Sequence, residues 1–150
     1  MKNIKWKFIE NSKEVTGGFD LILTPQINSL RFFLLATPVE KIPEFIRGLL
    51  NSEGGGGDQF TYIETFSNLD GGDFATGNSF NQDEIKVIHH VFGDVVLKEK
   101  VFFDIFYEFG LKVLKRNMNN DKLEKKWRDE MIKELKKLKF RIIELNKKDK

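Results

Sequence analysis

With 150 residues, 40% hydrophobic and 32% charged, the chain has the composition of one folded domain that needs neither disulfides nor metals. It contains no cysteine, which excludes disulfides, thiolate metal sites and a cysteine nucleophile and fits the reducing cytoplasm. The net charge is +2, no signal-peptide-like apolar stretch is present, and no run approaches the ~20 apolar residues that span a bilayer, so we expect a cytoplasmic protein.

The small net charge conceals an uneven distribution along the chain. Residues 51–110 hold three basic and eleven acidic side chains, whereas residues 111–150 hold fifteen basic and seven acidic ones. Charge segregation of this kind can steer oppositely charged partners, although both segments can also be ordinary solvated faces. The acidic centre and the basic C-terminal part are therefore the two candidate interaction regions.

The first part of the chain reads as strands. Residues 4–9 alternate apolar and polar side chains, which predicts a half-buried strand, and residues 19–23 predict a second short one. Residues 30–36 are more uniformly apolar, and we expect a central strand there.

A short helix is expected next. Thr37 and Glu40 have the spacing of a capping box, but Pro43 suits the first turn of a helix better than its interior, so a helix that begins at Pro43 is the alternative. Either helix ends before the four glycines of residues 54–57, which predict a flexible loop.

The acidic centre predicts strands and turns. Residues 58–67 read as a strand with Tyr62 and Glu64 on the same face, and residues 68–81 are rich in turn-forming residues. Residues 84–91 predict another strand, with residues 95–97 as its hairpin partner.

Two helices are expected at the end of the chain. Residues 98–117 carry a wide apolar stripe, interrupted by Gly110, where we expect another element to approach closely. Asn119, Asn120 and Asp121 can cap a last helix that places a narrow apolar seam among charged residues. The seam can dock on its own domain, pair with a second copy or bind a partner; its residues are Leu123, Trp127, Met131, Leu135, Leu138, Ile142 and Leu145.

Together these elements predict an α+β fold in a single domain of residues 1–150. We expect a mainly antiparallel sheet of four to six strands, with helices near residues 42–50 and 98–117 on one face. Residues 119–150 form an appended, long amphipathic C-terminal helix.

The residue patterns do not indicate a catalytic or metal site. His89 and His90 are adjacent, so on a strand their rings point to opposite faces and do not share a metal. The glycines at 54–57 are followed by Asp58 rather than by the Lys-Ser/Thr of a phosphate-binding loop. Asp70, Asp73, Asp83 and Glu84 lie in hydrophilic segments without the burial that raises the pKa of a catalytic acid. We therefore expect no cofactor, no metal and no enzymatic activity, with an enzyme of another type as a third alternative.

The basic C-terminal helix suggests nucleic-acid or regulatory binding as the main alternative. Its cationic side chains can neutralise phosphates, but acidic residues are interspersed and no helix-turn-helix or RNA-binding signature is present. The cations in question are Lys125, Lys126, Arg128, Lys133, Lys136, Lys137, Lys139 and Arg141.

The acidic centre is the preferred binding surface. Carboxylates interleaved with a few aromatic side chains suit a positively charged protein partner, because charge speeds association and aromatic rings supply buried anchors. The predicted partner-binding residues are Asp58, Tyr62, Glu64, Asp70, Asp73, Asp83 and Glu84, with Phe66 and Phe74 among them.

Residues about 40–116 resemble the immunity proteins of bacterial polymorphic toxins. The resemblance is carried by a short helix from Ile42 to Leu50, a Gly-rich stretch that leads to the aromatic strand at residues 60–64, the Asp/Gly turn at residues 69–74, the segment 80–87 and a Phe-rich helix beginning near Val101. In particular, it resembles immunity proteins of contact-dependent growth inhibition systems that neutralise ribonuclease toxins. The basic helix after Asn119 lies outside it.

The resemblance implies a cytoplasmic inhibitor that binds a cognate toxin domain and blocks its active site or substrate path. It does not imply the fold or target of the toxin. Pairing of two copies through the C-terminal helix is an additional expectation from the apolar seam.

Overall fold

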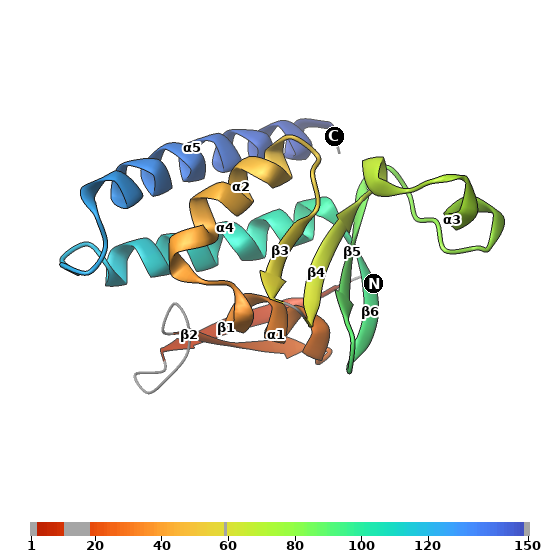
Figure 1. Cartoon of the computed structure of the whole chain (residues 1–150), viewed down its shortest axis with the longest axis horizontal. Coiled ribbons are helices and arrows are strands. Elements are labelled where there is room, and N and C mark those ends of the chain that lie inside the picture. The colour runs from red at the N-terminus through yellow and green to blue at the C-terminus, as the bar shows by residue number, and fades with distance from the viewer. Residues whose placement is uncertain (1–2, 11–18, 59, 149–150) are drawn as a thin grey trace.

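The computed structural model describes residues 3–10, 19–58 and 60–148, and for residues 57 and 58 it describes the backbone alone. Within these ranges the fold is α+β, as predicted, and combines helices with antiparallel sheets (Figure 1). The elements in chain order are β1 (Lys5–Glu10), β2 (Phe19–Thr24), α1 (Asn28–Ala36), α2 (Ile42–Leu50), β3 (Gly55–Asp58), β4 (Thr61–Thr65), α3 (Gly71–Ala75), β5 (Glu84–His89), β6 (Gly93–Lys98), α4 (Glu99–Arg116) and α5 (Lys125–Lys148).

The strands form two sheets. β1 and β2 make a two-stranded antiparallel sheet, and the other strands make a four-stranded antiparallel sheet in the order β3-β4-β5-β6. Because successive side chains on a strand point to opposite faces, the register places Ile63, Ile85, Val87 and Leu97 on one face, where all four are buried in the core.

The prediction of a strand at residues 30–36 is wrong, because this segment lies in helix α1. Leu30, Phe33 and Leu34 are buried, and the helix contacts β2 of the small sheet as well as the strands of the large one. A helix that is covered on more than one side needs apolar residues around most of its circumference, so its sequence lacks the usual amphipathic period. This explains why its pattern resembled a buried strand.

Helix α2 begins at Ile42, with Pro43 in its first turn, as the second of the two alternatives predicted. Thr37 does not cap it: its hydroxyl donates to the carbonyl oxygen of Phe33 at 2.8 Å, and the chain makes a 3-10 turn at Val39–Lys41 before the helix. Phe45, Ile46 and Leu49 form the buried face of this helix.

Helices α4 and α5 complete the core. The predicted stripe of α4 is confirmed by Phe102, Ile105, Phe106 and Phe109, each with no exposed surface. The predicted apolar seam is buried from Leu123, just before α5, to Ile142, and it is half-buried at Leu145. Helix α5 packs against α2 and α4 (Figure 1). The seam therefore docks on its own domain.

Two other expectations need correction. The glycine stretch at residues 54–57 is mostly strand rather than loop, because β3 pairs with β4. The last helix begins at Lys125, and Asn120 does not cap it but accepts from the Lys122 amide and donates to Asn117.

The described residues contain no helix that is both long and apolar enough to cross a membrane.

Candidate partner-binding site

The outer face of the four-stranded sheet carries two of the predicted binding residues. Tyr62 and Glu64 alternate with buried residues of β4 and are half-buried on this face. In the register, Glu64 stands opposite Lys86 of β5, and Tyr62 stands opposite Ile88. The face is thus mixed in character: apolar at its centre, with carboxylates and a cation around it.

Residues 66–83 form a projection that follows β4 in the chain and leads to β5. Figure 1 shows that α3 stands apart from the helices that enclose the core. Phe74 is 54% exposed there, with its ring edge-on to Phe66 at 6.1 Å. Phe80, in the segment that leads back to β5, is buried. The sequence predicted only turns in this segment, so the short helix is a correction.

Asp70 and Asp73 shape this projection. Asp70 caps α3 by accepting a hydrogen bond from the Asp73 amide at 3.0 Å, and the Asp73 carboxylate accepts one from the Asp70 amide, also at 3.0 Å. Two helix-terminal donors are satisfied reciprocally, which holds the carboxylates side by side at the N-terminus of the helix. The spacing of two acids three residues apart before Phe74 was the sequence signal for this turn of helix.

Asp83 and Glu84 lie at the base of the projection, where each has a local partner. The Lys98 ammonium group lies 2.8 Å from the Asp83 carboxylate and lowers the pKa of that carboxyl by donating a hydrogen bond to it. Glu84 accepts from the Asn81 amide at 2.8 Å. The positive charge of Lys98 therefore offsets part of the negative charge that the sequence suggested here.

The structure does not assign Asp58, the remaining predicted binding residue, to this surface. Its backbone belongs to β3, opposite Thr61 of β4, and its side chain lies outside the described part of the chain. The remaining predicted residues divide into the sheet-face pair, the capping pair of α3 and the pair at the base of the projection.

A partly exposed aromatic cluster that was not expected from the sequence lies at the opposite end of the sheet. Phe32 of α1 stacks on Phe92 with ring centroids 4.9 Å apart, and His89 lies 4.8 Å from the Phe92 ring. The Nδ1 atom of His89 accepts from the amides of Val91 and Phe92, so His89 orders the turn between β5 and β6. His90 is exposed beside Tyr62, which agrees with the expectation that the two imidazoles point apart.

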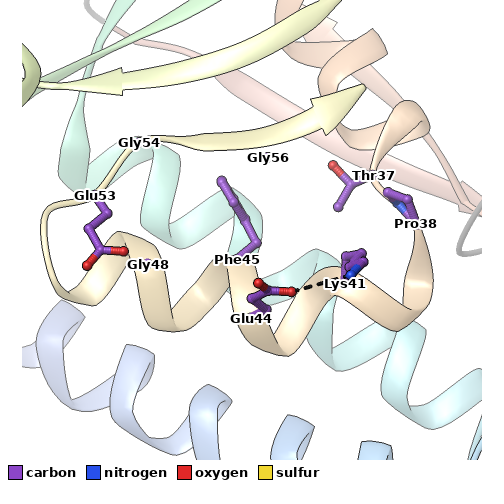
Figure 2. Close-up of a pocket in the computed structure, with 9 residues that line it drawn as sticks. All are labelled: Thr37, Pro38, Lys41, Glu44, Phe45, Gly48, Glu53, Gly54 and Gly56. Carbon is purple, nitrogen blue, oxygen red and sulfur yellow. Dashed lines mark ion pairs between the residues drawn. The ribbon is translucent and has the colours of Figure 1, made fainter. Parts of the chain in front are cut away.

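A groove was also missed. It has a volume of about 480 Å³ and separates the glycine strand β3 from α2, with Phe45 and Gly48 on the helix side and Gly54 and Gly56 on the strand side (Figure 2). The helix at residues 42–50 was predicted. Strand β3 was not, because its glycines have no side chains that could alternate between apolar and polar. The groove between the two elements was therefore not expected.

Two carboxyl groups of α4 have raised pKa values. Burial raises the pKa of Glu99 and of Asp104, both on α4, and no cluster of three or more potential metal ligands occurs among the residues that the structure describes. Asp104 is four residues from Lys100, whose charge partly offsets the effect of burial on the pKa of Asp104.

The basic residues of α5 form the other candidate surface. Lys133, Lys136 and Lys139 are exposed, whereas Arg128 and Arg141 are half-buried. Several neighbouring charges are engaged within the protein: the Lys137 ammonium lies 3.6 Å from the buried Glu134 carboxylate, and Lys126 lies 3.9 Å from Glu130. The helix is therefore partly an ion-paired element of the fold.

No family model matches the chain, and comparison with curated proteins and with solved structures also gave no match.

Proposed function

We propose that this protein binds and neutralises a bacterial toxin domain with a basic surface, in the manner of the immunity proteins that its sequence resembles. The observation that carries the proposal is the projection with Asp70, Asp73 and the exposed Phe74, which follows the strand that presents Tyr62 and Glu64. The resemblance to inhibitors of ribonuclease toxins makes a nuclease the expected activity of the toxin domain.

This combination of charge and aromatic surface supports recognition by contact. An aromatic side chain that is more than half exposed on a projecting element is poised to enter a pocket of a partner, where it becomes a buried anchor. The carboxylates beside it attract a cationic partner and raise the association rate. Because Asp70 and Asp73 are held by their capping hydrogen bonds, little side-chain freedom is lost when the partner binds.

The test uses the toxin domain encoded next to this gene, co-expressed with the protein. The triple variant Glu64→Gln, Asp70→Asn, Asp73→Asn removes three charges, while Asn still caps a helix well. We expect slower association with a weaker dependence on salt, and Phe74→Ala should raise the dissociation rate. A matched control, Asp121→Asn, Glu124→Gln, Asp129→Asn, removes three charges near the start of α5 and should leave binding unchanged.

The possible outcomes test the proposed binding surface and the immunity function separately. If the triple variant and Phe74→Ala both bind and protect as the unmodified protein does, this surface is not the binding site. If the unmodified protein neither binds nor protects against the neighbouring toxin domain, the immunity function itself is wrong.

Nucleic-acid binding through α5 is the second candidate. It is favoured by Phe140, which is 65% exposed on the same helix as the exposed Lys136 and Lys139 and is suited to stack on a base. Binding to random RNA that weakens steeply with salt, and that is lost in Lys136→Gln, Lys139→Gln and Phe140→Ala variants, would favour it. Hydrolysis or modification of that RNA by the protein alone would instead indicate an enzyme.

A further inference from the structure

The groove between β3 and α2 follows the free edge of the large sheet. β3 is the end strand in the order β3-β4-β5-β6, so among the described residues no strand pairs with its outer side. Figure 2 shows Thr37 and Pro38 at one end of the groove, Glu53 and Gly54 at the other, and the Phe45 ring rising between them. The long direction of the groove is therefore that of the strand.

Gly48 keeps the helix side of this groove low. A glycine inside a helix is destabilising relative to alanine, and it is usually explained by a close approach or by a positive φ angle. Neither applies at Gly48: an added Cβ atom would meet only Glu53 side-chain atoms, at an ordinary 3.8 Å. By contrast, a Cβ atom at Gly56 would come 2.4 Å from the Phe45 ring. Packing therefore does not require a glycine at position 48, and the missing side chain leaves space in the groove beside Glu53.

The charged groups on the groove walls indicate the sign of its occupant. Glu44 is paired with Lys41 at 3.6 Å. Glu53 is exposed at the end of the groove and forms no ion pair with any residue that the structure describes. A carboxylate in this position matches a cationic side chain of a bound segment.

We propose that an extended segment of the toxin domain, carrying a lysine or arginine, lies in this groove and adds to the edge of β3 through main-chain hydrogen bonds. The proposal rests on the proposed function and names the element of the partner that is recognised. Strand addition gives affinity through backbone groups, and here specificity comes from the pairing of the cation with Glu53. The added strand would extend the same sheet that presents Tyr62 and Glu64.

The experiment combines a blocking substitution with a direct reading of the strand. In Gly48→Trp the indole should fill the groove and lower the affinity for the neighbouring toxin domain by at least about tenfold, whereas Gly48→Ala should change it by less than about twofold. Glu53→Lys should weaken binding in the same direction as Gly48→Trp. Hydrogen exchange should slow in the complex at whichever of the Gly55 and Gly56 amides points away from β4. Thermal unfolding of each free variant checks that it is folded.

The outcomes distinguish this proposal from the function on which it rests. If the unmodified toxin domain binds with equal affinity to Gly48→Trp and leaves exchange at Gly55 and Gly56 unchanged, strand addition is wrong and the immunity function stands. If the unmodified protein does not bind the toxin domain, both fail. A dimer of the free protein that Gly48→Trp dissociates would also overturn the proposal, because a second copy would then occupy the groove.

Discussion

Gly110 of α4 lies directly against Leu135 of α5: a Cβ atom built at Gly110 would come 2.7 Å from a methyl carbon of Leu135. Leu135 is 3% exposed, so its methyl group is enclosed by the core. The two helices can approach this closely because one of them lacks a side chain at the contact. The glycine that interrupts the apolar stripe of α4 is thus explained by packing.

Gly110→Val should destabilise the protein by about 1–3 kcal/mol, because the added methyl groups overpack the α4–α5 contact. Urea unfolding measures the loss. The same substitution made in a Leu135→Ala background should cost less, because the truncated side chain leaves room, and this non-additivity reports the contact itself. Equal costs in both backgrounds would show that the two residues do not restrict each other.

Phe106→Ala should cost about 3–5 kcal/mol, the range for removing a fully buried aromatic ring and leaving a cavity. Phe106 has no exposed surface and lies within 6 Å, centroid to centroid, of the Phe45, Phe102 and Phe109 rings. A change of less than about 1 kcal/mol in a urea melt would contradict this assignment. Leu111→Ala is the control on the same helix, since Leu111 is 42% exposed.

The sequence predicted those elements whose burial follows a simple period. α4 and α5 were predicted because each buries one stripe, and β4 because Ile63 faces the core while Tyr62 and Glu64 alternate with it. α1 was misread because it contacts both sheets and is apolar around much of its surface. β3 was missed because glycines carry no side chains that could show a period.

Only part of the candidate site could be predicted from a simple period in the sequence. The common face of Tyr62 and Glu64 followed from strand alternation, whereas the projection depended on a reciprocal cap between Asp70 and Asp73 that stabilises a helix starting with two glycines. The groove depended on the distance between α2 and β3, which is set by the packing of Phe45 against Gly56. The cap is a local spacing that can be read from the sequence, whereas the distance between α2 and β3 depends on tertiary packing and is not visible in any local pattern.

Asp20→Asn should destabilise the protein at neutral pH by about 1 kcal/mol, a typical value for a partly exposed ion pair. Two Arg31 nitrogens donate to the Asp20 carboxylate at 2.8 Å, and these bonds hold the pKa of Asp20 below its ordinary value. A carboxyl with a lowered folded-state pKa binds fewer protons in the folded state, so its contribution is present above the unfolded pKa of about 3.9 and is lost as pH falls through the folded pKa.

Urea unfolding of the unmodified protein and of the Asp20→Asn variant between pH 7 and pH 2 tests this dependence. The stability difference between the two proteins should shrink as the pH drops below about 4 and should not reappear at lower pH. A difference that is independent of pH would mean that the ion pair does not stabilise the fold.

Trp127 should report the docking of α5. Its indole nitrogen donates to the carbonyl oxygen of Val39 at 2.8 Å, and the residue is only 7% exposed. In a Trp6→Phe background its fluorescence should shift to longer wavelength on unfolding, together with the loss of helical circular dichroism. A shift that precedes the loss of helix would instead show that α5 detaches before the domain unfolds.

Leu138→Ala and Phe140→Ala should differ sharply although the two residues are neighbours on α5. Leu138 has no exposed surface, so its truncation should cost about 2–5 kcal/mol, whereas Phe140 is 65% exposed and its truncation should change stability by no more than about 0.5 kcal/mol.

Deleting residues 119–150 removes the whole seam and should expose the apolar surfaces of α2 and α4, which we expect to cause aggregation. A monomeric truncated protein as stable as the full chain would mean that α5 serves a partner rather than the core.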